Sequence, residues 1–281
     1  MGTTKNEIVP VTESFVALRP EYDIREVMEM NLGGGEGISL FDFERVKLGA
    51  GGSTSFTIES PDGEEDTVKT FEALICHRVD QRSYWSVGMD EGGGATPPDC
   101  SSFDLQTGYG DNGNGDGEHA CRTCPKNQWG SDPKGGKGKA CSQTVKLMLL
   151  RQGAEASPFP SVLSVPAGSL KQFNRYMFAL TAKGVGFKAG VHKFSLEKDT
   201  SATGVVFAKL KVELVRKLED AEAERVEAYG EAIAATLSAM APEGRADSAE
   251  PVSGEVVEGE ATVEGDDDWQ KEAAATVGGS E

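Results

Sequence analysis

The sequence predicts a β-rich α+β fold: an OB-like barrel or a related sheet with a zinc-ribbon insertion, a C-terminal helix and a disordered acidic tail. Segments with strand-like alternation lie on both sides of residues 96–142. Four of the five cysteines fall inside that interval, and the hydrophobic period changes from strand to helix near residue 217. The 38% hydrophobic content supports a core. No apolar run approaches the ~20 residues of a membrane-spanning helix, so we expect a cytoplasmic protein without a membrane partner.

The first third of the chain is expected to hold an extension and then strands. Residues 1–35 form the N-terminal extension, with a short amphipathic helix at 22–32. A β-rich core is expected over 36–216, beginning with three strands that are rich in β-branched residues or alternate in polarity. These strands are FDFERVKLG (41–49), STSFTIES (53–60) and TVKTFEALICHRV (67–79). The Pro61-Asp62-Gly63 turn separates the last two, because proline presets φ and glycine permits positive φ.

The second part of the core follows the cysteine region. Residues 145–153 predict a buried strand, because most of its first positions are apolar and a glycine closes it. A helix is expected over 169–183, with Ser169 as its N-cap and Gly184 as its stop. Strands at 192–198 and 204–215 then alternate apolar with charged residues and predict a hairpin.

The C-terminal part changes character twice. Residues 217–240 predict a charged helix whose apolar stripe is sparse, so we expect it to pack lightly or to serve self-association as a homo-oligomer. The stripe comprises Leu218, Val226, Ile233 and Leu237. Residues 241–281 are acidic and lack any periodic apolar pattern, which is typical of a disordered tail.

The cysteine spacing predicts a structural zinc site. Cys100, Cys121, Cys124 and Cys141 are separated by 20, 2 and 16 residues. A Cys-x2-Cys turn brings two thiolates to one ion, and structural zinc takes four such ligands in a tetrahedron. The surrounding Gly-rich segment holds too few apolar residues to order itself, so the metal would supply what a core does elsewhere.

The ligand set has open alternatives. His119 could replace Cys100, and Cys76 and His77 lie at the end of an apolar strand, where Cys76 is expected to be a packed core thiol. The cysteines could also be unrelated free thiols. A redox pair or an iron–sulfur centre fits the setting less well.

Catalysis is not expected. Four cysteines would close the zinc coordination sphere, whereas catalytic zinc keeps an open position. The three histidines, His77, His119 and His192, show no metal-catalytic spacing such as HExxH. No Gly-x-Ser-x-Gly nucleophile elbow is present either.

Charge is distributed unevenly along the chain. Residues 121–217 hold 17 basic and 5 acidic residues, a net of +12, although the whole chain carries −18. Residues 241–281 hold 2 basic and 12 acidic residues, a net of −10. A basic middle with acidic ends indicates a polyanionic partner for the middle.

Aromatic residues accompany this positive charge, as single-stranded nucleic acid binding requires. Such proteins combine a basic groove with aromatic platforms on which bases stack. Tyr84, Trp85 and Trp129 lie in polar or loop surroundings and are the candidate platforms, although each could instead pack in the core. The candidate phosphate contacts are Arg122, Lys126, Lys134, Lys137 and Lys139.

Three segments carry a resemblance to known proteins. PPDCSS (97–102), HACRTCPKNQWGS (119–131) and GGKGKACSQ (135–143) resemble the cysteine core of a bacteriophage and prophage zinc-ribbon family. The wider architecture is similar to phage single-stranded DNA-binding proteins. The resemblance implies a structural zinc, single-stranded DNA as partner, and a role in phage DNA replication or recombination inside a host cell.

The same resemblance gives a role to the tail. In such proteins an acidic C-terminus competes with DNA and recruits replication or recombination proteins. Here Asp266, Asp267, Asp268 and Trp269 form an acidic patch with one apolar anchor and are the candidate partner-binding residues. The alternative is a phage structural or assembly protein, or a recombination mediator, whose zinc only stabilises the fold.

Overall fold

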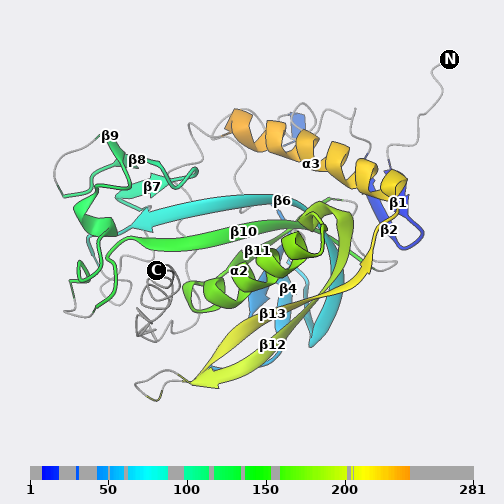
Figure 1. Cartoon of the computed structure of the whole chain (residues 1–281), viewed down its shortest axis with the longest axis horizontal. Coiled ribbons are helices and arrows are strands. Elements are labelled where there is room, and N and C mark those ends of the chain that lie inside the picture. The colour runs from blue at the N-terminus through cyan, green and yellow to red at the C-terminus, as the bar shows by residue number, and fades with distance from the viewer. Residues whose placement is uncertain are drawn as a thin grey trace, which may run out of the picture.

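A computed structural model describes the chain over residues 8–18, 30–31, 43–49, 51–59, 63–87, 98–113, 117–133, 137–152, 159–200, 204 and 206–240. Over these residues the protein is a β-rich α+β structure, as predicted. It contains an 11-stranded sheet, a separate 2-stranded hairpin and two long helices (Figure 1).

Two long antiparallel strands form the centre of the sheet. β6 (Thr70–Tyr84) pairs with β10 (Ser142–Arg151) along almost its whole length. On its other edge β10 pairs antiparallel with β11 (Ser161–Val165), and β11 pairs in parallel with β3 (Arg45–Leu48). The sheet then ends with two further antiparallel strands, β4 (Phe56–Glu59) and β5 (Glu65–Val68).

The other edge of β6 is shared by two different strands. Its first residues pair with β12 (Gly190–Thr200), which forms the predicted hairpin with β13 (Val206–Lys217). Its last residues pair with β7 (Cys100–Ser102). The C-terminal end of β6 and the N-terminal end of β10 therefore extend beyond the rest of the sheet and connect to the cysteine region (Figure 1).

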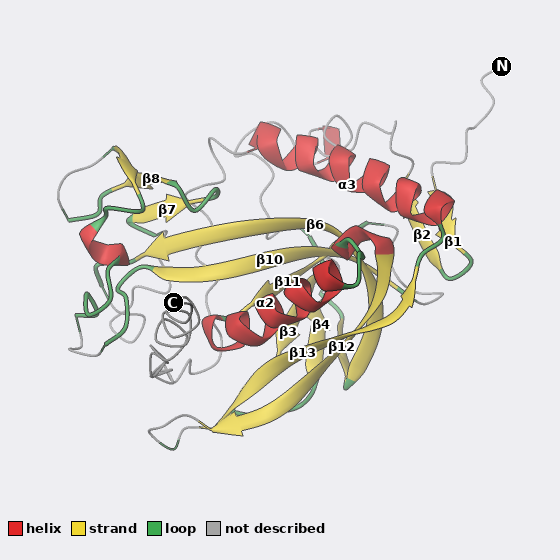
Figure 2. Cartoon of the chain, viewed as in Figure 1, coloured by secondary structure: helices red, strands yellow, loops and turns green. Residues whose placement is uncertain are grey.

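Helices cover both faces of the sheet (Figure 2). α2 (Ala167–Ala182) buries Phe173 in one apolar cluster, together with strands from both ends of the sheet. The sheet is strongly curled, because the Phe71 ring contacts both Phe56 and Phe194 at centroid distances of 5.1 and 5.0 Å. β5 and β13 each pair with a single strand among the described residues, so the ladder there is a curled open sheet.

The opposite face is covered by α3 (Asp220–Met240) and by the hairpin of β1 (Ile8–Thr12) and β2 (Phe15–Leu18). All three elements contribute to one buried cluster, whose members include Val11, Phe15, Val226, Tyr229 and Ile233. Residues 8–18 are thus part of the core, where an extension was expected, and α3 packs closely, where light packing was expected. Tyr229 joins the predicted stripe because its ring lies on the same helical face.

Element ends differ from the predictions for identifiable reasons. Ser169 is not the N-cap: α2 begins at Ala167 after Pro166, and Ser169 Oγ accepts a 2.9 Å hydrogen bond from the Leu210 amide inside the core. Gly184 does end the helix with φ +67°, and Val185 N–H donates back to the Leu180 carbonyl. The helix predicted from 217 begins at Asp220, because Lys217 still belongs to β13.

Several predictions lie outside the described residues. Only residues 30–31 of the predicted 22–32 helix are described, and they are helical. The acidic tail, with Asp266, Asp267, Asp268 and Trp269, lies wholly outside them. Within the part of the chain that the structure describes, no helix has the length and apolarity to cross a bilayer.

The contact between α3 and β6 depends on a glycine. The register of β6 against β10 shifts next to Cys76, and α3 approaches the backbone at that point. A Cβ at Gly230 would lie 2.2 Å from the Cys76 carbonyl oxygen, which is far inside van der Waals contact. A side chain at this position would therefore force the helix and the strand apart.

Gly230→Ala is accordingly expected to lower the free energy of unfolding by about 1–3 kcal/mol through overpacking. This would exceed the gain of roughly 1 kcal/mol that alanine gives over glycine within a helix. Urea denaturation would measure it. Gly186→Ala is the matched control, because its Cβ would meet nothing within 4 Å and its φ of −69° suits alanine. Equal stability of the two variants would contradict the close approach.

Candidate metal centre and nucleic-acid interface

The four clustered cysteines come together in a lobe, defined here as the described residues between 98 and 141. The lobe contains β7, β8 (Thr107–Gly110), β9 (Glu118–Ala120) and the 3-10 turn η4 (Pro125–Asn127). A continuous loop was expected, so the three short strands are a correction. Each is only three or four residues long and pairs with its neighbour, extending the main sheet from the end of β6.

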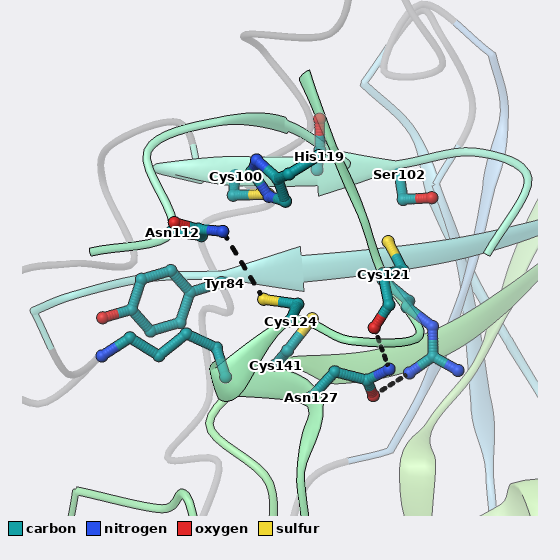
Figure 3. A pocket seen from close by; sticks show the side chains of 12 residues that line it. Tyr84, Cys100, Ser102, Asn112, His119, Cys121, Cys124, Asn127 and Cys141 are labelled. Atoms are coloured by element: carbon teal, nitrogen blue, oxygen red, sulfur yellow. Dashed lines mark hydrogen bonds between the residues drawn. The ribbon is translucent and has the colours of Figure 1, made fainter. Parts of the chain in front are cut away.

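The four cysteines line one cavity (Figure 3). Cys100 begins β7, Cys121 and Cys124 flank the turn before η4, and Cys141 directly precedes β10. Cys100, Cys121 and Cys124 are buried, and Cys141 is half-buried. The enclosed space is about 10 Å³, which suits an occupant the size of one water molecule or one ion.

Backbone contacts shape the Cys-x2-Cys turn. Asn127 N–H donates to the Cys124 carbonyl at 3.1 Å, and Asn127 Nδ2 donates to the Cys121 carbonyl at 2.7 Å. The Cys141 amide donates to the Lys126 carbonyl at 2.8 Å and so ties the last cysteine to the same turn. Asn127 therefore has a structural role at this turn, through both its main chain and its side chain.

The cysteine side chains have polar neighbours. Cys100 Sγ lies 3.2 Å from His119 Nε2, and Cys124 Sγ lies 3.8 Å from Asn112 Nδ2. Among the described residues, no three His, Cys, Asp or Glu side chains are already arranged as a metal-binding group. The structure thus brings the predicted ligands around one cavity, with His119 beside Cys100 among its lining residues.

Burial and the proximity of the other cysteines raise the pKa of two of these thiols. Burial, and after it the charges of the neighbouring Cys141, Cys121 and Cys124, together raise the pKa of Cys100 to about 12. Burial also raises the pKa of Cys141 to about 11, against the opposing effects of Arg82 and Lys139. Ionising several of these thiols together requires a positive charge in or beside the cavity, because like charges in a buried place disfavour ionisation.

Arg82 is a cavity residue that the sequence did not reveal. It lies on β6, lines the cavity, and donates from Nη1 to Asn127 Oδ1 at 2.6 Å. Its Nε is buried without a hydrogen-bond partner among the described residues. Its partner Asn127 is 45 positions away in the chain, so no local pattern marks the pair.

The predicted nucleic-acid residues divide into exposed and buried sets. Trp129 is 68% exposed, and the Lys139 ammonium lies 5.0 Å from its ring centroid. Arg122 and Lys137 are exposed in the same lobe, whereas Lys134 lies outside the described residues. Among the described residues of the lobe, Trp129 is the most exposed aromatic side chain, and these cations lie in the same lobe.

Tyr84 and Trp85 are less accessible than predicted. Tyr84 is only 7% exposed, lines the cavity and lies under the Lys126 ammonium at 5.0 Å. It is therefore part of the cavity wall in this structure, and its ring is not open to a base. Trp85 is half-buried.

The remaining cysteine and histidines are placed elsewhere. Cys76 is fully buried with its pKa raised to about 12 by burial, which confirms the core-thiol interpretation. His192 is buried in a different part of the core, where Nε2–H donates to the Phe187 carbonyl at 2.7 Å and Nδ1 accepts from the Tyr176 hydroxyl at 2.5 Å. His77 lines an open groove between β6 and α3.

Comparison of the chain with models of protein families, with curated protein sequences and with solved structures found no match.

Proposed function

We propose that Cys100, Cys121, Cys124 and Cys141 hold one structural zinc ion. Their convergence on one ion-sized cavity supports the proposal. Thiolates are the soft donors that zinc favours, and a divalent cation would supply the positive charge that these crowded, buried thiols lack. Arg82 and Lys139 would balance part of the remaining negative charge. His119 is the alternative fourth ligand to Cys100.

We further propose that the protein binds single-stranded DNA and has no enzymatic activity. The observation that carries this proposal is Trp129, an exposed ring with Lys139 stacked on it and with Arg122 and Lys137 in the same lobe. Exposed aromatics beside cations bind successive bases and phosphates without sequence preference. In this proposal zinc holds the lobe rigid so that Trp129 is presented to DNA.

The wider biological role is proposed from the resemblance of the cysteine segments. The chain would act in phage DNA replication or recombination in the host cytoplasm. In this proposal the curled sheet corresponds to the OB-like barrel of such proteins. Its acidic residues 241–281 would be a disordered tail that recruits replication or recombination proteins through Asp266, Asp267, Asp268 and Trp269. A phage assembly protein or a recombination mediator is the alternative.

Trp129→Ala is expected to weaken binding to oligo-dT by about 5- to 150-fold, because base–aromatic stacking contributes roughly 1–3 kcal/mol per base. Fluorescence anisotropy of a labelled oligonucleotide across a salt series would measure the affinity. Trp129→Phe keeps a ring and should retain most of the affinity. Duplex DNA is the control ligand and should bind more weakly.

Two outcomes would decide between the proposed roles. If the wild-type chain does not bind oligo-dT even at low salt, DNA binding is excluded, and the assembly role becomes the better explanation of a zinc-held lobe. If it binds and Trp129→Ala has the same affinity, the lobe is not the interface.

A further inference from the structure

A second exposed aromatic residue lies outside the lobe. Phe178 on α2 is 75% exposed, which makes it the most exposed aromatic side chain of the described residues, ahead of Trp129. The opposite side of the helix buries Phe173 and Leu180 against the sheet. Phe178 is therefore not needed for packing of the helix on the sheet.

Two cations lie on the same stripe of the helix surface as Phe178. Lys171, Arg175 and Phe178 are all exposed, and their spacing places them on one stripe of the helix. α2 contains no Asp or Glu. By contrast, Lys209 and Lys211 on β13 form ion pairs with Asp199 and Glu197. We name Lys171, Arg175 and Phe178 the α2 stripe.

The α2 stripe and the lobe belong to the same side of the sheet. Arg78 of β6 lies on the face that α2 covers, because its guanidinium is 5.6 Å from the Phe173 ring centroid. Alternation along β6 places Arg82 and Tyr84 on that face as well, and both line the cysteine cavity. A ligand that contacts Trp129 can thus continue along this side toward α2.

We propose that the α2 stripe is a second contact surface for single-stranded nucleic acid; this rests on the proposed function. An exposed ring beside two cations that form no ion pair with the described residues offers one stacking platform and two phosphate contacts. The same combination of ring and lysine occurs at Trp129 and Lys139. The partner is a polyanion with unpaired bases, because a duplex would offer phosphates but no open base for Phe178.

The test measures oligo-dT affinity of the full-length chain by fluorescence anisotropy across a salt series. Phe178→Ala is expected to weaken binding by about 5- to 150-fold. The double variant Lys171→Gln/Arg175→Gln should reduce the slope of log affinity against log salt by about 1 to 1.5, since each phosphate contact on a single strand contributes roughly 0.7. Val215→Ala and Lys217→Gln, which change exposed residues of β13, are the matched controls and should leave both quantities unchanged.

The outcomes separate this inference from the proposed function. Binding that depends on Trp129 but not on Phe178, Lys171 or Arg175 would overturn the inference alone. Absence of any binding to oligo-dT by the wild-type chain would overturn both. If the α2 variants keep full DNA affinity but lose binding of a synthetic GDDDWQK peptide, the stripe is a site for an acidic peptide and the inference is wrong. All variants change exposed side chains, so an unchanged melting temperature would confirm that they fold.

Discussion

Cys124→Ser is expected to remove zinc from the protein and to unfold the lobe while the main sheet stays folded. Structural zinc in small cysteine sites binds with an apparent free energy of about 10–16 kcal/mol, and this energy is folding energy for the segment that it holds. The lobe has little else to order it, because its strands are three or four residues long and its only buried hydrophobic side chains among the described residues are Cys100, Cys121 and Cys124. Serine is a poor replacement, since it offers a protonated hydroxyl where zinc needs a thiolate.

The measurement pairs metal content with local protection. We expect elemental analysis to find about one zinc per wild-type chain and little in Cys124→Ser, and limited proteolysis to cut the variant between residues 98 and 141. Cys76→Ala is the matched control, because Cys76 is buried in the core and does not line the cysteine cavity. It should lower global stability but keep the zinc. A wild-type chain purified without metal, or a Cys124→Ser variant with the same metal content as the wild type, would contradict the zinc site.

Patterns of apolar residues made the main body predictable. The strands of β6, β10, β12 and β13 follow from alternation or continuous apolar runs, because a strand buried against a helix must be apolar on that face. α2 follows from the spacing of Leu170, Phe173, Met177 and Leu180. Apolar patterns indicate which side chains are buried, so they predict the helices and strands that are stabilised by packing in the core.

Contacts between residues far apart in the chain were not predictable. Ser169 fits an N-cap by residue type, but its hydroxyl accepts from Leu210, 41 positions later. The β1–β2 hairpin is short and its partner α3 lies more than 200 residues away, as the hydrogen bond from Arg225 Nε to the Val11 carbonyl shows. A single sequence does not carry this information, because each residue alone is ordinary for its local setting.

The candidate site was predictable in part. Cysteine spacing identified the residues that line one cavity, because a Cys-x2-Cys turn is a local pattern. Arg82 and Asn127 were not predicted as site residues, because their hydrogen bond forms only when the fold brings β6 next to the Cys-x2-Cys turn. Tyr84 was misjudged for a related reason: its sequence surroundings are polar, yet the lobe folds over it.

The other large effect is expected at a buried ion pair that joins β3 to the rest of the sheet. Arg151 donates from Nε and Nη2 to the two carboxylate oxygens of Glu44, both at 2.9 Å, and Ser161 Oγ also donates to Glu44. The Glu44 side chain is 6% exposed. β3 and β11 share only two register pairs, and the Val162 amide donates to the Glu44 carbonyl at 2.7 Å just beyond them. Glu44 is therefore the main polar link at a short parallel contact.

Glu44→Ala is expected to lower the free energy of unfolding by about 3 kcal/mol, because it leaves the Arg151 guanidinium, whose side chain is only 15% exposed, without its counter-charge. Urea denaturation would measure the change. The double variant Glu44→Leu/Arg151→Met should be less destabilised than Glu44→Ala, since it removes the isolated charge as well as the pair.

An exposed pair supplies the comparison. Lys211 and Glu197 lie 3.3 Å apart on the β12–β13 hairpin with more than a third of each side chain exposed. Solvent and salt screen such a pair, so Glu197→Ala should leave stability nearly unchanged. If Glu44→Ala has as small an effect as Glu197→Ala, water must reach Arg151 readily, and the link between β3 and β11 must depend on the apolar contacts of Val46 and Leu163 instead.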